Sequence, residues 1–335
     1  MSEIRENKLT GEWVIIAPAR AKRGTNLAPA PAAAQPPAYL ASCPFCPGNE
    51  VEVDERFRID DAGGNWLVRS VLNKFSVLSP TGDADASKCA PTGEAVVSAV
   101  GLHEVLVESP LHDSSFARGS IVAAGRILAA YRQRFLEFHA DPRVRHVIIF
   151  KNHGAEAGAS QQHPHSQIVG LPILPGQIAD RIDRTRRFFA ETGQCLACSL
   201  IERERTLGSR IVAENDDFVA FIPHAALSPY HLWIFPKAHS ACFAGHPGFP
   251  ALAEILHTVL AKIDGMLDNP PFNLIIRSLG PDEDGSPFFH WYVSIVPRVN
   301  RTAGFELGTG MYINPSLPEE RAASLRDFCP NPPSK

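Results

Sequence analysis

The sequence predicts an α+β fold in which one structural unit occurs twice along the chain. Each half contains a Cys-x-x-Cys pair, then a lone histidine, and then a second histidine that follows the first after 51 residues and opens a short β-rich run. From just before the first of these histidines to the second, both halves show a strand, a long helix, a strand and a loop in the same order. This order favours helices that pack on antiparallel sheets.

The first half contains three predicted strands and one helix. Residues 104–108, Glu-Val-Leu-Val-Glu, favour a strand. Apolar side chains recur at helical spacing through residues 118–139, and residues 144–150 are rich in β-branched side chains. A loop with two glycines then leads to a histidine-containing strand from residue 163 to about residue 171.

The second half repeats these elements in the same order. Residues 231–235 favour a strand, and residues 249–267 carry apolar side chains at helical spacing. A further strand is predicted over residues 272–278, and a loop rich in Gly, Pro and Asp separates it from the last strand, over residues 289–296.

The length and composition are those of an ordinary globular protein. A chain of 335 residues with 44% hydrophobic and 20% charged residues is long enough for two domains or one large duplicated domain. We expect one domain over residues 1–175 and the other over residues 176–335. The net charge of -4 gives no support to a surface that binds nucleic acid.

The cysteines and the N-terminal segment indicate the compartment. The residues up to Trp13 are polar and charged, so we expect no signal peptide, and no stretch reaches the roughly 18 apolar residues of a membrane span. Seven cysteines, an odd number without a secretion signal, favour a reducing compartment and a use in metal binding or redox chemistry. We therefore expect a cytoplasmic protein.

Each half carries the four ligands of a closed zinc site. Structural zinc takes four Cys or His ligands in a tetrahedron, and a Cys-x-x-Cys turn supplies two of them. The two predicted sites are Cys43, Cys46, His112 and His163 in the first half, and Cys195, Cys198, His239 and His290 in the second.

Two other interpretations of the cysteine pairs remain open. The second pair could be a thioredoxin-like redox pair, which requires a position at a helix N-terminus after a strand. The preceding residues Arg187-Phe188-Phe189-Ala190 favour a helix instead. Either set could also consist of buried cysteines with unrelated histidines.

The first half alone has an extra histidine, at position 165, which points to a single reaction centre. In an extended strand, alternate side chains share a face, so His163, His165 and Gln167 would point the same way. A metal at His163 would fix the neighbouring backbone and hold His165 as a nucleophile, which histidine can be near neutral pH. The loop 154–160 and the Ser160 hydroxyl could stabilise charge on phosphoryl oxygens. The alternative is that His165 only packs in the strand or binds the same zinc.

The run Gly158-x-Ser160-x-x-His163-Pro164-His165-Ser166-Gln167 resembles the active-site signature of the galactose-1-phosphate uridylyltransferase family, a branch of the histidine-triad superfamily. The similarity extends over nearly the whole chain. Other segments in the family's order are Leu9-Thr10-Gly11-Glu12-Trp13-Val14, Arg20-Ala21-Lys22-Arg23, Cys43-Pro44-Phe45-Cys46, Asn73-Lys74-Phe75, Glu108-Ser109-Pro110-x-His112 and Asn152-x-Gly154.

The resemblance implies a fold, a reaction and a role for individual residues. It implies two histidine-triad-like half-barrels in a homodimer, with His165 attacking the α-phosphorus of a nucleoside diphosphate sugar to give a covalent nucleotidyl-His. A second phosphate then accepts the nucleotidyl group, which completes a ping-pong cycle. The implied phosphate-binding residues are Ser160, Gln167, Arg20, Arg23 and Asn152; Asn73 and Phe75 would hold the base and ribose; and Cys43, Cys46, His112 and His163 would bind zinc.

Departures from the family pattern bear on the substrate. Some members bind a second metal through histidines of the strand equivalent to 290–296, where this chain has Ser294 and Val296. The second cysteine pair and the segment 304–315 instead resemble a subgroup with two zinc sites, which includes a plant enzyme resembling ADP-glucose phosphorylase. Thr309 and Gly310 stand where other members present aromatic and acidic residues to the hexose.

The first expectation is a zinc-stabilised transferase that moves a UMP group between UDP-glucose and galactose 1-phosphate. One alternative is an adenylyltransferase of the ADP-glucose phosphorylase type, which uses phosphate as the acceptor. The other alternative is a non-catalytic nucleotide-binding protein, although His165, Ser160 and Gln167 are all present and argue against it.

Overall fold

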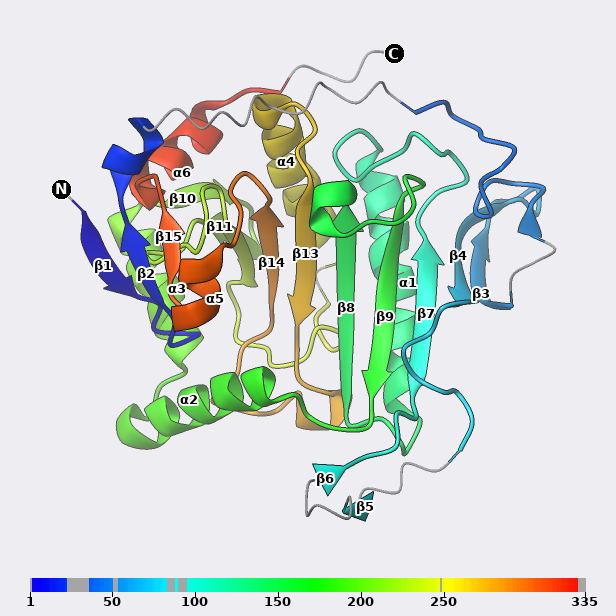
Figure 1. The fold of residues 1–335 in the computed structure, drawn as a ribbon, viewed down its shortest axis with the longest axis horizontal. Coiled ribbons are helices and arrows are strands. Elements are labelled where there is room, and N and C mark those ends of the chain that lie inside the picture. The colour runs from blue at the N-terminus through cyan, green and yellow to red at the C-terminus, as the bar shows by residue number, and fades with distance from the viewer. Residues whose placement is uncertain are drawn as a thin grey trace.

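The computed structural model describes residues 2–22, 36–50, 54–82, 88–89, 95–247 and 249–330. Within these residues, one ten-stranded sheet runs in the spatial order β10, β11, β12, β14, β13, β8, β9, β7, β4 and β3, with every neighbouring pair antiparallel (Figure 1). The strands are β3 Glu55–Asp60, β4 Trp66–Leu72, β7 Leu102–Val107, β8 His146–His153, β9 His165–Leu171, β10 Ile211–Glu214, β11 Phe218–Phe221, β12 Leu232–Pro236, β13 Phe272–Arg277 and β14 Tyr292–Pro297.

The two halves of the sequence meet in the middle of this sheet. There β8 from the first half pairs with β13 from the second, with Ile149 opposite Ile276 and His153 opposite Phe272. The order of strand, helix, strand, loop and strand occurs in both halves, as the sequence predicts. The expected α+β class, with antiparallel strands and packed helices, is confirmed.

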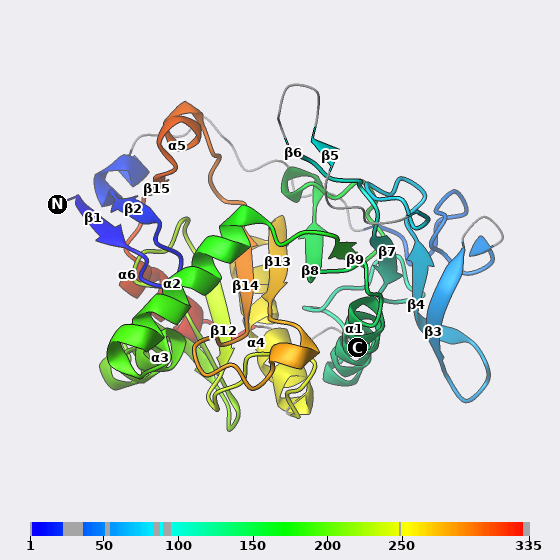
Figure 2. The ribbon, with the colours of Figure 1, turned by 90° about the horizontal axis from the view of Figure 1, so that it is seen from below.

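Two long helices cover one face of the sheet. Helix α1 (Ile121–His139) begins after Ser120, whose hydroxyl accepts a hydrogen bond from the backbone N–H of Ala123 and so satisfies a free donor of the first turn. Helix α4 (Phe249–Leu267) is its counterpart in the second half. The two helices pack against each other on the same side of the sheet (Figure 2). Their apolar stripes form the main core with the strands; buried members include Leu128, Phe135, Leu256 and Leu260.

Smaller elements surround one end of the sheet. A three-stranded sheet joins β1 (Glu3–Glu6) and β2 (Trp13–Ile16) to β15 (Tyr312–Asn314), and the pairing of β2 with β15 is parallel. The remaining described elements are the helices α2 Gly176–Thr192, α3 Leu196–Leu207, α5 Gly304–Thr309 and α6 Pro318–Asp327, the short 3-10 turns η1 Pro18–Lys22, η3 Ala155–Ala157 and η4 Pro281–Glu283, and the strands β5 Lys88–Cys89 and β6 Ala95–Val96. No helix in the described ranges is long and apolar enough to cross a membrane.

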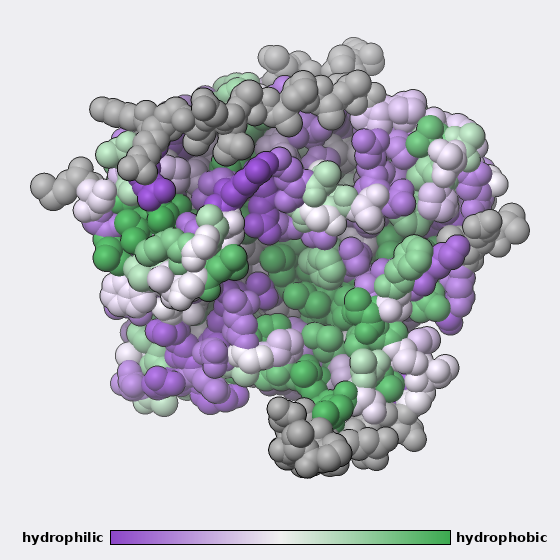
Figure 3. Space-filling view, in the orientation of Figure 1, coloured by the Kyte–Doolittle hydropathy of each residue, from purple (hydrophilic) through white to green (hydrophobic). Residues whose placement is uncertain are grey.

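The face of the sheet opposite α1 and α4 is the one seen in Figure 3. Apolar side chains gather over the middle of this face, where β8 and β9 run. Alternate residues of β8, namely Ile148, Phe150 and Asn152, line a cavity of about 320 Å³ beside them. Ser166 of β9 contacts Tyr131 of α1, so its neighbours in the strand point to the opposite, open face.

Candidate functional site

The structure brings together the four residues of the first predicted metal site. Cys43, Cys46, His112 and His163 are all buried, and their ligand atoms lie within 4.8 Å of one another. The Nδ1 atom of His163 lies 3.7 Å from the sulfur of Cys43, 3.6 Å from that of Cys46 and 3.3 Å from Nδ1 of His112. The Cys46 sulfur lies 3.5 Å from Nδ1 of His112.

These separations fit a tetrahedral zinc ion. Bond lengths of about 2.3 Å to sulfur and about 2.0–2.1 Å to nitrogen give tetrahedron edges of roughly 3.3–3.8 Å. The outward nitrogen of His163, Nε2, lies 2.8 Å from the backbone oxygen of Ser109. A hydrogen bond there fixes the ring with Nδ1 toward the other ligands, as outer partners do in metal sites.

The second predicted set comes together in the same way. Cys195, Cys198, His239 and His290 form a group with ligand atoms within 4.8 Å of one another. The Cys198 sulfur lies 3.4 Å from Nδ1 of His239 and 3.5 Å from Nδ1 of His290. The outer nitrogens of both rings lie 3.0 Å from backbone oxygens, and hydrogen bonds there would fix each ring with Nδ1 toward Cys198.

The position of the second pair bears on the redox alternative. Cys195 caps the N-terminus of helix α3, but the element before it is helix α2, not a strand. The helix that the sequence predicts around Arg187–Ala190 is therefore present, and it removes the strand that a thioredoxin-like arrangement requires.

His165 begins strand β9 and lies outside the first metal group. Its Nδ1 atom lies 2.8 Å from the backbone oxygen of His163, so the proton of the neutral ring belongs on Nδ1 and the lone pair on Nε2. Nε2 has no hydrogen-bond partner in the part of the chain that the structure describes. Burial, and secondarily the ammonium of Lys151, lower the pKa of His165, which favours the neutral, nucleophilic ring. Phe45 packs near the same ring, with 5.8 Å between the ring centroids.

The loop before the histidine strand has a backbone that only glycine adopts easily. Gly154 has φ 80° and Gly158 has φ 91°, on either side of the 3-10 turn η3. A Cβ atom at Gly154 would lie 2.8 Å from Cβ of Pro271, so this position also requires a close approach of two segments. The loop is fixed in place further by Asn273, whose amide donates to the backbone oxygen of Ala157 at 2.8 Å.

Gln167 and Asn73 both lie close to the ring of His103, which the sequence analysis does not single out. The Nε2 atom of His103 lies 2.8 Å from Oε1 of Gln167 and 3.0 Å from Nδ2 of Asn73. The backbone N–H of Phe75 donates to Oδ1 of Asn73 at 2.9 Å, and the Phe75 ring is 84% exposed. Burial lowers the pKa of His103, so its ring is neutral near pH 7. The signal in the sequence that could have pointed to His103 is its position directly before the strand predicted over residues 104–108.

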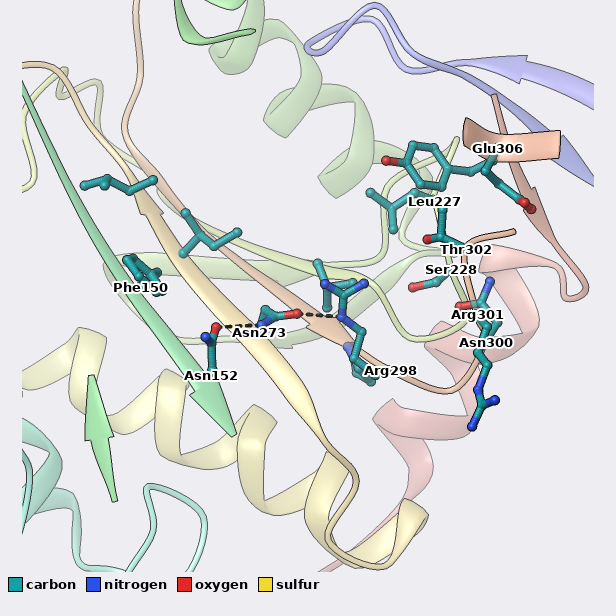
Figure 4. A pocket seen from close by; sticks show the side chains of 15 residues that line it. Phe150, Asn152, Leu227, Ser228, Asn273, Arg298, Asn300, Arg301, Thr302 and Glu306 are labelled. Atoms are coloured by element: carbon teal, nitrogen blue, oxygen red, sulfur yellow. Dashed lines mark hydrogen bonds between the residues drawn. The ribbon is translucent and has the colours of Figure 1, made fainter. Parts of the chain in front are cut away.

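Asn152 lies in the cavity on the open face, with Phe150 and Asn273 (Figure 4). The Asn273 amide donates to Oδ1 of Asn152 at 2.8 Å, and Nε of Arg298 donates to Oδ1 of Asn273. These contacts join a residue of the first half to two of the second. Glu306 of α5 lines the far side of the same cavity.

The structure describes only one of the two predicted N-terminal arginines. Arg20 is exposed and lies in η1, which follows the small sheet strand β2. Arg23 lies outside the described residues. Ser160 precedes β9 in the loop, and none of the described hydrogen bonds involves its hydroxyl.

Comparison with known proteins finds relatives that match almost the whole chain. The model of the galactose-1-phosphate uridyl transferase N-terminal domain matches residues 1–175, and that of a domain of unknown function matches residues 134–327. The ADP-glucose phosphorylase of Arabidopsis thaliana is 36% identical over 330 residues, which cover 97% of this chain and 92% of that protein. The galactose-1-phosphate uridylyltransferase of Thermotoga maritima is 28% identical, with 98% of each protein covered.

Solved structures have the same fold. A crystal structure of an ADP-glucose phosphorylase from Arabidopsis thaliana with bound ADP-glucose superposes with a TM-score of 0.83 at 34% identity, covering 98% of this chain and 99% of that one. A solved uridylyltransferase shares the fold with a TM-score of 0.75 at 24% identity. Because both sequence and structure match over almost the entire length, this chain belongs to the galactose-1-phosphate uridylyltransferase family, a nucleotidyltransferase branch of the histidine-triad superfamily.

Proposed function

We propose that the protein is an adenylyltransferase that uses ADP-glucose as the donor and inorganic phosphate as the acceptor, through a covalent intermediate on His165. The observation that carries the reaction is the ring of His165, which lies outside the metal group with Nδ1 held by the backbone and Nε2 unpaired among the described residues. The choice of donor is supported by the 36% identity to an ADP-glucose phosphorylase, against 28% to a uridylyltransferase. The comparisons thus favour the adenylyl alternative over the uridylyl version that the sequence analysis put first.

The two steps balance without any further reactant. In the first step, Nε2 of His165 forms a bond to the α-phosphorus, the bond from that phosphorus to the bridging oxygen breaks, and glucose 1-phosphate leaves. In the second step, an oxygen of inorganic phosphate attacks the same phosphorus, the phosphorus–nitrogen bond breaks, and ADP leaves. The neutral ring of His165 is restored for the next cycle.

Other residues bind the substrate in this proposal. Gln167, Ser160 and Asn152 would donate hydrogen bonds to phosphoryl oxygens, where charge grows in the transition state. Asn73 and Phe75 would hold the base and ribose, since the exposed Phe75 ring offers an apolar surface beside Asn73. Arg20 and Arg23 would bind phosphate as cations.

We assign a structural role to both metal groups and propose zinc as the metal. Each offers two cysteines and two histidines with separations of the tetrahedral kind, and a zinc ion with four protein ligands has no open position for substrate. The zinc would brace the turn Cys43–Cys46 against His163 and so hold the start of strand β9. We also keep the boundary at residue 175 and a homodimer as proposals.

Labelling with either nucleotide sugar tests the function directly. The enzyme is incubated with ADP-glucose or UDP-glucose labelled at the α-phosphorus, quenched in alkali, and examined for protein-bound label that acid releases. We expect label from ADP-glucose in the wild type and none in His165→Gly, with metal content unchanged. The matched control is His257→Gln, a histidine of α4 whose Nε2 lies 2.9 Å from the backbone oxygen of Gly119.

The outcomes separate the alternatives. Label from UDP-glucose alone, chased by galactose 1-phosphate, would establish the uridylyl version, for which the Thermotoga maritima relative is the support. Binding of nucleotide without any label would indicate the non-catalytic alternative. Label that persists in His165→Gly would show that another residue is the nucleophile.

A further inference from the structure

A buried polar cluster lies behind the reactive histidine, on the helix side of the sheet. Its members are Glu108, Lys151, Tyr131 and Ser166. Lys151 donates to Glu108 at 2.8 Å, and the side chains of the two are only 2% and 1% exposed. The Glu108 carboxylate also accepts hydrogen bonds from the hydroxyls of Ser166 and Tyr131, and burial raises the pKa of Tyr131 well above its ordinary value, so its proton stays in place.

Glu108 and its neighbour Ser109, directly or through Lys151, make hydrogen bonds with the four successive residues 163–166. The Ser109 oxygen lies 2.8 Å from the outer ring nitrogen of His163, and the Glu108 backbone N–H donates to the oxygen of Pro164 at 3.0 Å. The ammonium of Lys151, paired with Glu108, donates to the oxygen of His165 at 3.1 Å.

The hydroxyl of Ser166 completes the set by donating to the Glu108 carboxylate. The ring of His165 is in turn bonded to the oxygen of His163. Both the backbone that carries the ring and the acceptor that orients it are therefore fixed by the same two neighbouring residues.

The free energy of folding gives only a weak reason for burying the ion pair of Glu108 and Lys151. A fully buried ion pair gains little over apolar side chains of the same size, because desolvation of the two charges offsets their attraction. Positioning of the His165 ring is a better reason, because a small displacement of an attacking atom lowers the reaction rate far more than it lowers the stability of the fold.

We propose that Glu108 and Lys151 are positioning residues for His165: the pair fixes the backbone of the nucleophile so that Nε2 is aligned with the α-phosphorus. This proposal rests on the transferase function proposed above. It goes beyond that function by naming a second set of residues, away from the substrate, on which the rate of the chemical step depends.

The chain offers a matched control in β7, the strand that ends just before Glu108. Glu104 of β7 lies four residues before Glu108, faces the same helix and forms a buried ion pair with Arg134, at 2.6 Å. That pair makes no described hydrogen bond to residues 163–167. Removing it tests the effect of losing a buried ion pair without touching the nucleophile.

The experiment compares the double variants Glu108→Gln/Lys151→Met and Glu104→Gln/Arg134→Met with the wild type. Each replaces both charges, so that no unpaired charge is left in the core. Rapid quench with labelled ADP-glucose gives the rate constant of adduct formation and the dissociation constant separately. We expect the Glu108/Lys151 variant to form the adduct at least about ten-fold more slowly, with a dissociation constant within about two-fold of the wild type and unchanged metal content. The control keeps the wild-type rate constant.

A second measurement does not depend on any substrate. Proton–nitrogen correlation spectra of protein labelled with ¹⁵N-histidine report which nitrogen of His165 carries the proton and whether the ring has one orientation. We expect a single Nδ1–H signal in the wild type and the control, and a broadened or doubled signal in the Glu108/Lys151 variant. Should that variant fail to fold, Tyr131→Phe removes one hydroxyl from the cluster and is measured in the same way, with a smaller effect expected.

The results distinguish failure of this proposal from failure of the function. Equal adduct rates and equal His165 signals in the two double variants overturn the positioning role. If the wild type forms no adduct with any nucleotide sugar while the His165 signal changes only in the Glu108/Lys151 variant, the transferase function falls, and what stands is that the pair orients the His165 ring.

Discussion

The ring of His103 is bonded to the side-chain amide of Gln167, with 2.8 Å between Nε2 and Oε1. The other ring nitrogen accepts a hydrogen bond from the backbone N–H of Val77, so the proton of the neutral ring belongs on Nε2, which donates to Gln167. The amide nitrogen of Asn73, 3.0 Å from Nε2, is also a donor and therefore makes no hydrogen bond to the protonated Nε2. This bond fixes the oxygen end of the amide. The NH₂ end is then left to donate to a phosphoryl oxygen, which is the role proposed for Gln167.

Loss of this bond should slow the reaction. We expect His103→Phe to lower kcat/KM for phosphorolysis of ADP-glucose by about ten-fold or more, because the Gln167 amide loses its fixed orientation. The control is His146→Phe, a buried histidine of the neighbouring strand β8. Equal activity of the two variants would show that His103 only fills space.

The two metal groups should differ in their effect on the reaction. We expect Cys43→Ser to lose about one metal ion per chain, to destabilise the fold and to abolish adduct formation, because the same site holds His163 beside the nucleophile. Cys198→Ser should also lose about one ion and stability, but should still form the adduct, since its site lies in the other half of the chain. Metal content, thermal unfolding and labelling are measured on the same samples. Equal loss of adduct formation in both variants would show that the reaction does not depend specifically on the metal site that contains His163.

Much of this arrangement follows from the sequence because it depends on periodicity and spacing. The helix expected over residues 249–267 has those bounds in the structure, since its apolar positions repeat without interruption. Equal spacing of the two histidine pairs helped to identify both groups of ligands, because the segment of helix, strand and loop between the paired histidines has the same length in each half. The first helix begins at Ile121 instead of residue 118, where Ser120 provides the cap.

What the sequence did not predict depends on contacts between distant segments. Nothing local distinguishes Lys151 from a surface lysine, although it follows the apolar run of β8; only the fold pairs it with Glu108. His103 is not predicted as a site residue, because its partner Gln167 is 64 residues away in the sequence. The small sheet is a further case, since β2 and β15 come from opposite ends of the chain.

Acid should destabilise the fold through His231. This fully buried ring has one nitrogen without a described partner, and burial, with Arg181 and Arg277 nearby, lowers its pKa to about 3. Because the unfolded chain takes up a proton near pH 6.5 and the folded ring does not, stability is lost as the pH falls from 6.5 toward 3.

The variant His231→Phe/Ser294→Ala removes the ring together with its partner, whose Oγ lies 3.0 Å away. Between pH 7 and pH 5, we expect the free energy of unfolding to fall by about 2 kcal/mol less in this variant than in the wild type. Urea unfolding at both pH values measures the difference. Parallel pH dependence in the two proteins would contradict a neutral buried His231.

Replacement of Gly154 by alanine should lower the free energy of unfolding by more than the cost of a positive φ alone. Both Gly154 and Gly64 have positive φ, at 80° and 81°. A Cβ atom at Gly154 would lie 2.8 Å from Pro271, whereas nothing lies within 4 Å of one at Gly64. Gly64→Ala therefore measures the cost of a positive φ at an open position, which we expect to be about 1 kcal/mol. Gly154→Ala adds the clash and a backbone with ψ 153°, which is nearly confined to glycine, so we expect a further loss of about 1–3 kcal/mol and slower adduct formation, because the displaced loop carries Ser160. Equal losses in unfolding experiments on the two variants would show that the contact with Pro271 yields without cost.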